Sequence, residues 1–248
     1  MALNKAKIIT VTSVKGGTGK TTMTLNIAGV LSQMQKKTII VDFDLYFGSI
    51  AASLNLKPTS DIYTLNEDMM NNRFHDLKDY VNSYNEYVDV LAAPIDPRNV
   101  SKFSTKFFEV LLSRLSMQYE VILIDTNHIT DKINLMALDH SDTVLYIMTN
   151  DLMDMKNMKT MMSIYKDMDK NNYKIILNEA HFGNANYSVY DIKNVIEADI
   201  NYIIPKSFYI NNIDKYLFDG TIMTLNKSIE NSKGGKVITK IVNDIIEE

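Results

Sequence analysis

The stretch "SVKGGTGKTT", residues 13–22, lies between an apolar run, residues 8–12, and a segment with helical periodicity. At such a junction the first amides of the helix lack internal partners, and the helix dipole is positive there. Gly16, Gly17 and Gly19 let the backbone curl so that successive amides point at one anionic group. The stretch therefore predicts a phosphate-binding loop.

Lys20 and Thr21 supply the polar groups that such a loop needs. Lys20 can reach the β- and γ-phosphates of a nucleotide, and the Thr21 hydroxyl is placed for a magnesium ion that bridges them. We therefore expect ATP and Mg²⁺ as ligands. The candidate ATP-binding residues of the loop are Lys15, Gly16, Gly17, Thr18, Gly19, Lys20, Thr21 and Thr22.

Outside the loop, short apolar runs alternate with longer amphipathic segments. We expect helices at Lys20–Gln33 and Phe103–Leu115, and an irregular stretch of short helices and loops from Asn55 to Glu86. The expected strands are Lys7–Ser13, Thr38–Phe43, Val88–Ala93, Glu120–Asp125, Thr143–Thr149, Tyr173–Asn178 and Tyr202–Ile204. This alternation predicts an α/β fold: a doubly wound, mostly parallel sheet of seven or eight strands with helices on both faces.

The loop departs from the usual pattern G-x-x-x-x-G-K-[ST], which would place its first glycine at Val14. A lysine, Lys15, stands directly before Gly16 instead. The form K-G-G-x-G-K-T-T resembles the deviant Walker A motif of the ParA/MinD-like P-loop ATPases. The resemblance implies that Lys15 is a catalytic residue that reaches the nucleotide of the other subunit in an ATP-dependent homodimer, while Lys20 serves its own phosphates.

Two further strand ends fit this resemblance. The second strand ends in "IIVDFDLYFG", and the family implies that Asp44 positions the attacking water or acts as general base, with Asp42 supporting the magnesium shell. The strand "EVILIDTN" has a Walker B pattern, in which Asp125 reaches the magnesium ion through a water. Residues 126–128 read Thr-Asn-His where the family often has proline or glycine. His128 is assigned no role, because a single loop histidine is more often incidental than catalytic.

The ends of two later strands supply candidates for the base. In the family, the asparagine after the sixth strand contacts adenine, which implies this role for Asn178 in "KIILNEA". The segment after the next strand closes over the base, so Pro205 and Lys206 of "YIIPKSF" are further candidates. Ligands bind at the carboxyl ends of the strands in a doubly wound sheet, and Asn178 fits that position.

The branch of the family is indicated by "VDFDLYFGSIAASLNLKPTSDIYTL", residues 41–65, and by "VLAAPIDP", residues 90–97. Both are similar to the ATPase domain of the CpaE/TadZ proteins of Flp pilus assembly, often preceded by a receiver-like domain. We expect 1–248 to be a single ATPase domain without that receiver-like domain. The implied function is an ATP-hydrolysing dimerisation switch for a Flp/Tad-type pilus at the cell pole, with pilus assembly proteins as partners.

Three alternatives stay open: a ParA-type partitioning ATPase, a MinD-like membrane-associated ATPase, and a localisation scaffold that barely hydrolyses ATP. A DNA-binding protein is more often basic, whereas this chain of 248 residues has a net charge of −4, so DNA is not expected as a partner. Residues 236–248 form an amphipathic pattern that ends in acids, so we expect packing onto the domain and at most peripheral membrane contact.

Bulk composition sets the remaining limits. The chain has no cysteine, which excludes disulfides, thiolate metal sites and cysteine nucleophiles. No apolar run approaches the roughly 18 residues of a membrane span, and the first residues lack the apolar core of a signal peptide. We therefore expect a cytoplasmic protein, with a polar or membrane-peripheral position open.

Overall fold

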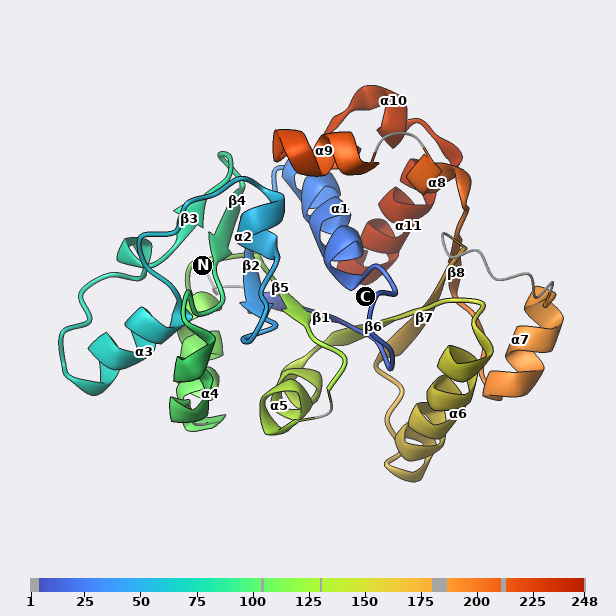
Figure 1. The fold of residues 1–248 in the computed structure, drawn as a ribbon, viewed down its shortest axis with the longest axis horizontal. Helices are drawn as coiled ribbons and strands as arrows, with labels where there is room; N and C mark the ends of the chain where they lie inside the picture. The colour runs from blue at the N-terminus through green and yellow to red at the C-terminus, as the bar shows by residue number, and fades with distance from the viewer. Residues whose placement is uncertain (1–4, 104, 130, 180–186, 211–212, 248) are drawn as a thin grey trace.

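One eight-stranded sheet organises the part of the chain that the structure describes, which in this computed structural model is residues 5–103, 105–129, 131–179, 187–210 and 213–247 (Figure 1). The strand order is β3-β4-β2-β5-β1-β6-β7-β8, and every pairing is parallel except β3 with β4. The strands are β1 (Lys7–Thr12), β2 (Thr38–Phe43), β3 (Asn82–Ser83), β4 (Val88–Leu91), β5 (Val121–Thr126), β6 (Thr143–Met148), β7 (Tyr173–Asn178) and β8 (Tyr202–Ile204). The predicted fold class is confirmed.

Helices cover both faces of the sheet (Figure 1). The α-helices are α1 (Lys20–Gln33), α2 (Ile50–Ser53), α3 (Ile62–Met70), α4 (Thr105–Leu115), α5 (Lys132–His140), α6 (Leu152–Asp167), α7 (Val189–Ile196), α8 (Ser207–Ile210), α9 (Ile213–Asp219), α10 (Lys227–Glu230) and α11 (Lys233–Glu247). Short 3₁₀ turns are η1 (Leu77–Asp79), η2 (Pro97–Lys102) and η3 (Met223–Leu225). Within the described residues no helix is both long enough and apolar enough to span a membrane.

The core lies in layers on the two faces of the sheet. On one face α1 and α11 pack on the strands, and α11 buries Ile238, Ile241 and Ile245 there. On the other face α4 and α5 cover the sheet on one side of β1, and α6 covers it on the other, with Met155 and Met158 fully buried. The expected packing of the C-terminal amphipathic segment onto the domain is thus confirmed.

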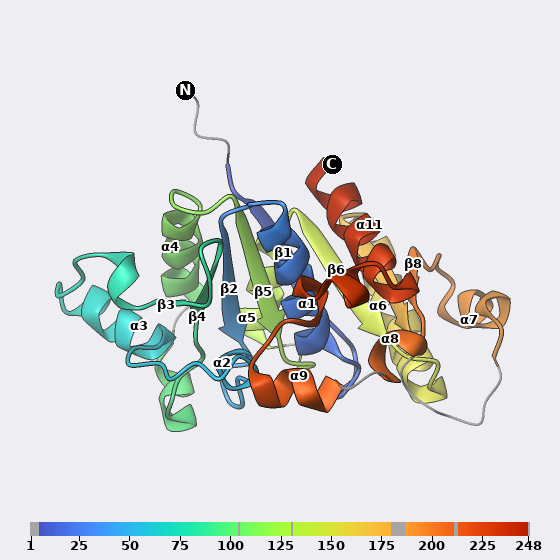
Figure 2. The same cartoon turned by 90° about the horizontal axis from the view of Figure 1, so that it is seen from above.

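The loops at the carboxyl ends of the strands gather at one edge of the sheet. Figure 2 shows α2 and α9 along the edge at which the strand arrows end, while α11 ends on the opposite side. β1 lies between β5 and β6, so the chain turns to opposite sides of it in its first and second halves. Such a reversal opens a crevice for ligands at the carboxyl ends of the central strands.

Candidate nucleotide-binding site

The glycine-rich loop runs from the end of β1 to the start of α1, as its sequence predicts. Gly17 (φ 75°) and Gly19 (φ 99°) adopt left-handed backbone conformations, which glycine reaches without the steric cost that a Cβ brings. Gly19 is the N-cap of α1 and has no side chain with which to cap the helix. The first amides of α1 therefore face the crevice as donors for an anion.

Lys20 is buried beneath the loop. Its side chain donates from Nζ to Ser13 Oγ at 3.0 Å, and Ser13 Oγ in turn donates to the Lys15 carbonyl at 2.6 Å. Burial lowers the pKa of Lys20, and the carboxylates of Asp125, Asp44 and Asp154 act in the opposite direction. The protein therefore holds a cation under the loop, where a phosphate would neutralise it.

Lys15 points away from the loop that carries it. Its Nζ forms an ion pair with Asp151 Oδ1 at 2.9 Å, and both side chains are close to half exposed. Asp151 is also the N-cap of α6, where Oδ1 accepts the amides of Met153 and Asp154. Sequence reasoning missed Asp151, because only the pairing of β1 with β6 brings it beside the loop.

Asp125, at the end of β5, joins the loop to the Walker B strand. Its two oxygens accept the hydroxyls of Thr21 and Thr24, both at 2.7 Å, and Thr21 also lies 3.2 Å from Ser49 Oγ. Burial raises the pKa of Asp125 to about 6, with hydrogen bonds from Thr24 and Thr21 opposing. The structure thus brings together Thr21 and Asp125, two of the predicted magnesium residues.

Asp42 holds the loop that carries Asp44. The Asp42 oxygens accept the amides of Asp44 at 3.2 Å and of Ile50 at 3.1 Å, and burial raises the pKa of Asp42 well above its usual range. Gly48 lies so close that a Cβ there would come within 2.7 Å of Asp42 Oδ2. Both oxygens of Asp42 are thus engaged by backbone amides, and its assignment to the magnesium shell stays a prediction.

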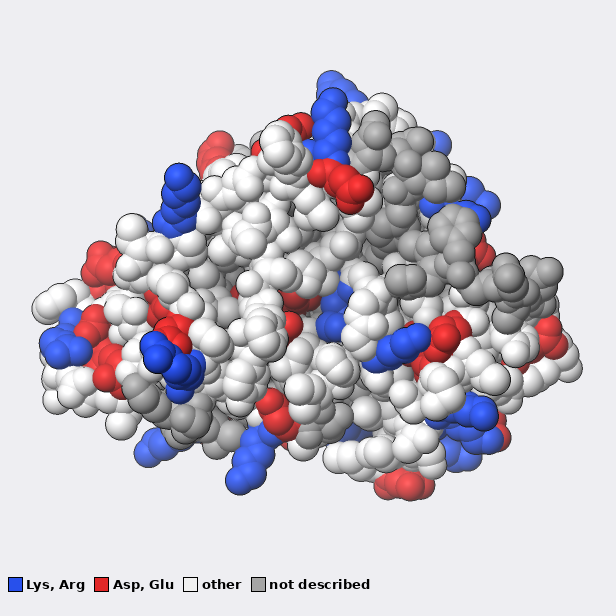
Figure 3. All heavy atoms as spheres, viewed as in Figure 1, with Lys and Arg blue, Asp and Glu red and all other residues white. Residues whose placement is uncertain are grey.

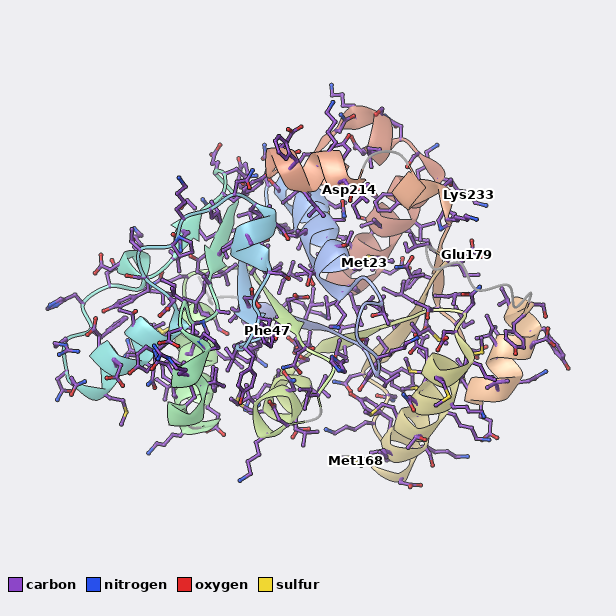
Figure 4. The ribbon with its side chains drawn as sticks, in the orientation of Figure 1. Met23, Phe47, Met168, Glu179, Asp214 and Lys233 are labelled. Carbon is purple, nitrogen blue, oxygen red and sulfur yellow. The ribbon has the colours of Figure 1, made fainter. Side chains whose placement is uncertain are left out.

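Asp44 itself is partly exposed and lines the crevice. The same loop projects Phe47, which is 82% exposed and is labelled in Figure 4. A mostly uncharged surface surrounds a recess near the middle of the face in Figure 3, and the recess contains basic atoms. The loop after β2 therefore offers both a carboxylate to the crevice and an aromatic side chain to solvent.

The predicted base-binding residues lie on the other side of β1. Asn178, at the end of β7, is buried and donates from Nδ2 to the Thr18 carbonyl at 2.8 Å. Pro205 is buried and Lys206 exposed just after β8, where the Pro205 carbonyl accepts the Phe208 amide at 2.9 Å. Asn178 thus contacts the phosphate loop directly, and the adenine contacts of all three residues stay predictions.

The crevice fits a nucleotide phosphate chain in size and chemistry. A cavity of about 490 Å³ is lined by Gly16, Gly17, Gly19, Lys20, Thr21, Thr22, Asp44, Thr126, Asn127 and His128. Beside it the Thr18 hydroxyl is buried and has no hydrogen-bond partner among the residues that the structure describes, which leaves a polar group for a ligand of the loop to satisfy. His128, assigned no role from sequence, belongs to this wall.

A family model described as an AAA domain matches residues 6–178, more than half of the chain. This chain belongs to the ParA/MinD-like P-loop ATPases. The chromosome partitioning protein ParA of Myxococcus xanthus is 28% identical over 145 residues, 56% of this chain and 50% of that protein. The family assignment explains why the loop and the Walker B strand converge as they do.

Two solved structures share the fold. The ParA family ATPase from Chlorobium tepidum superposes with a TM-score of 0.82 and 21% identity, over 96% of this chain and 98% of that one. The MinD protein of Pyrococcus horikoshii, complexed with Mg-ADP, gives 0.76 and 22% over 97% and 96%. At these sequence identities the similarity establishes the fold of this chain. It does not indicate the cellular process in which the chain takes part.

Proposed function

We propose that this ATPase family member binds ATP at the phosphate loop and that bound ATP joins two copies into a homodimer. One observation carries the proposal: the two lysines of the loop occupy opposite settings. Lys20 is buried and bonded to Ser13, whereas Lys15 is turned outward to Asp151. A lysine turned out of its own loop is suited to reach the phosphates held by a second subunit.

The ion pair with Asp151 does not prevent this reach. Both side chains are well exposed, and a solvent-exposed ion pair contributes only about 0–1 kcal/mol. A polyphosphate offers Lys15 more negative charge than one carboxylate does, and charge-assisted bonds to it are stronger. We infer that Lys15 exchanges Asp151 for the partner's nucleotide when the dimer forms.

Hydrolysis of ATP to ADP and phosphate is assigned to Asp44. Asp44 lines the cavity, and its backbone amide donates to the buried Asp42. A carboxylate at this place can orient water and accept its proton. We propose that turnover is slow and depends on the dimer, because the loop that carries Asp44 has exposed neighbours that the second subunit would order.

Thr21 and Asp125, with Asp42 behind them, are the residues that would hold Mg²⁺, the two aspartates through water. When bound, this ion supplies positive charge opposite the phosphate oxygens. At the other end of the site we assign the base to Asn178, Pro205 and Lys206. These three residues follow β7 and β8, on the far side of β1 from Asp44.

For the cellular process we propose positioning of a Flp/Tad-type pilus assembly system at the cell pole. The support is the similarity of residues 41–65 and 90–97 to CpaE/TadZ proteins. Residues 41–50 form the strand end and the loop that carries Asp44, so the similarity falls within the site.

A second candidate is DNA partitioning, which the 28% identity with ParA favours. The two candidates differ in one property that can be measured on the purified protein. A partitioning ATPase of the ParA type binds DNA without sequence preference, whereas a pilus-positioning ATPase recognises proteins.

Light scattering with ATP and Mg²⁺ on wild type and three variants tests the dimer switch. Lys20→Ala should bind no ATP, since the loop loses its buried cation. Lys15→Ala should bind ATP, because Lys20 and the loop amides remain, but should stay monomeric and lose most of its ATPase activity. Asp44→Ala should keep both lysines and accumulate as an ATP-bound dimer.

Asp151→Asn is the matched control for Lys15→Ala. It removes the same ion pair and leaves Lys15 in place, and asparagine is an equally good N-cap for α6. This variant should dimerise at least as well as wild type. If Lys15→Ala dimerises as well as Asp44→Ala does, Lys15 does not act across the dimer.

A further inference from the structure

His128 lies on the wall of the cavity that faces the glycine loop. Its ring packs against Gly16: a Cβ placed on Gly16 would lie 3.4 Å from both Cε1 and Nδ1 of the imidazole. These distances place the ring at van der Waals range from the glycine loop. The ring borders the same cavity as Lys20 and Asp44.

The backbone on both sides of His128 is anchored. Thr126 Oγ1 donates to the Val11 carbonyl at 3.1 Å. The buried Asn127 Oδ1 accepts the Ile129 amide at 2.7 Å and Asn134 Nδ2, from α5, at 2.6 Å. The loop is thus tied to β1 and to α5, so His128 starts from a fixed point at the rim of the cavity.

The imidazole nitrogens have no hydrogen bond or ion pair with any residue in the described part of the chain, and the side chain is exposed. His140 differs, since its Nδ1 lies 2.9 Å from the Met136 carbonyl on its own helix. An imidazole always carries at least one N–H donor. At His128 that donor is available to a ligand in the cavity.

The strand order shows which part of a nucleotide His128 would meet. Asn178 and Pro205 follow β7 and β8 on one side of β1, whereas His128 follows β5 on the other side, next to β2 and Asp44. The phosphate loop leaves β1 between them. A nucleotide with its base over β7 and β8 therefore ends with its terminal phosphate on the side of His128.

We propose that His128 donates an imidazole N–H to the terminal phosphate of bound ATP, and that this contact makes the site distinguish ATP from ADP. The inference rests on the proposed ATP-binding function and adds a residue specific to this chain's Thr-Asn-His sequence. His128 is then a residue that contacts the substrate and favours the ATP-bound form of the protein over the ADP-bound form.

Calorimetry with a non-hydrolysable ATP analogue and with ADP tests this contact. His128→Ala should weaken the analogue about tenfold and leave ADP affinity within twofold, since a hydrogen bond to a charged group is worth about that factor. His128→Gln keeps an N–H donor and should retain most of the wild-type preference for the ATP analogue. Because His128 is exposed, both variants should melt at the wild-type temperature.

His140→Ala is the matched control, a second exposed histidine that does not line the cavity. It should leave both affinities unchanged. Equal weakening of the ATP analogue and ADP in His128→Ala, or no weakening of either, would overturn the inference. Absence of ATP binding by the wild-type protein would instead reject the proposed function, so the two failures are distinct.

Discussion

The carboxylate of Asp125 is buried, and a second buried carboxylate, that of Asp42, lies beside it on the neighbouring strand. The two residues are neighbours in the register of β2 and β5, and each is 1% exposed. Thr21, Thr24 and Lys20 stabilise the charge of Asp125, yet burial outweighs them and raises its pKa to about 6. The ligand-free site therefore carries an unfavourable charge that a bound cation would relieve.

This charge should make the ligand-free protein less stable as pH rises. Below about pH 4 Asp125 is protonated in both states; between pH 4 and 6 the unfolded chain releases its proton first. The proton bound by Asp125 in the folded state stabilises the protein at low pH, and this contribution to the free energy of unfolding is lost as the pH rises through about 6. The loss is about 3 kcal/mol at most, because the pKa of Asp125 is raised from 3.8 to about 6. Asp125→Asn should therefore be more stable than wild type at pH 7.5, and similar near pH 4.

Chemical denaturation in buffer without nucleotide and magnesium would measure this difference. Asp214→Asn, on the exposed side of α9, serves as the control and should follow wild type at every pH. A variant Asp125→Asn that is less stable than wild type at pH 7.5 would show that the threonine hydrogen bonds outweigh burial.

At the scale of elements, hydrogen bonds join α1 to the segment that contains η3, which we call the η3 segment. Asn26 Oδ1 accepts the Thr224 amide at 3.1 Å, and Thr224 Oγ1 donates to the Asn26 carbonyl at 2.8 Å. Gly29 allows this approach, because a Cβ there would lie 2.2 Å from Thr224 Oγ1 and 2.6 Å from Ile222 Cγ2. The η3 segment thus positions the helix that begins at the phosphate loop.

Gly29→Ala should destabilise the protein although alanine is the better helix former. The gain in helix propensity is about 1 kcal/mol, whereas the new Cβ displaces the η3 segment and breaks its two hydrogen bonds with α1. We expect a net loss of about 1–3 kcal/mol in the free energy of unfolding. Ser113→Ala, at an exposed position of α4, should instead be neutral or slightly stabilising. Thermal unfolding of both variants measures the difference in stability. A Gly29→Ala variant more stable than wild type would contradict the close packing of the η3 segment on α1.

Much of this architecture could be predicted, and the exceptions have physical reasons. Seven strands are apolar runs that pack on both faces, so their pattern is visible; β3, the polar pair Asn82–Ser83, exists only through its pairing with β4. The amphipathic pattern covers residues 236–248, whereas α11 begins at Lys233, and its Gly235 lies where a Cβ would come within 2.0 Å of the Ile229 carbonyl. Propensity alone disfavours glycines in a first turn.

The candidate site divides in the same way. The loop and Thr21 follow from spacing along the chain, because a strand, a turn and a helix fix their relation. Asp125 is recognisable from the pattern of its own strand, but its hydrogen bond with Thr21 spans 104 positions. The Lys15–Asp151 pair, the Asn178–Thr18 bond and the packing of His128 on Gly16 join residues more than 100 positions apart. Such contacts depend on which strands become neighbours, and a single sequence does not specify that order.

At the scale of the whole molecule, charge is mixed and not gathered. The net charge is −4, and Figure 3 shows basic and acidic side chains interspersed around that face, with charged atoms also in the recess near its middle. Several surface lysines are paired with acids, among them Lys36 with Glu120, Lys159 with Glu197 and Lys193 with Asp199. Binding of a DNA backbone through its phosphates is favoured by cations gathered on one face, whereas the net charge of this chain is negative.

We therefore expect the ATP-bound protein to bind plain duplex DNA weakly at physiological salt. Fluorescence anisotropy with a labelled duplex at two salt concentrations would measure this, with the Asp44→Ala variant included to hold the ATP-bound state. Tight binding that falls steeply with salt would favour partitioning over pilus positioning.

The packing of α11 on α1 also has a consequence for the order of events during synthesis. α1 leaves the ribosome about two hundred residues before α11, which packs against one side of it. Before then α1 can pack on β1, β2 and β5, but its contacts with α11 form slowly because they are so distant in the chain. A nascent chain that stalls before residue 233 would therefore carry a complete phosphate-loop sequence, while the side of α1 that α11 covers stays exposed and prone to aggregation.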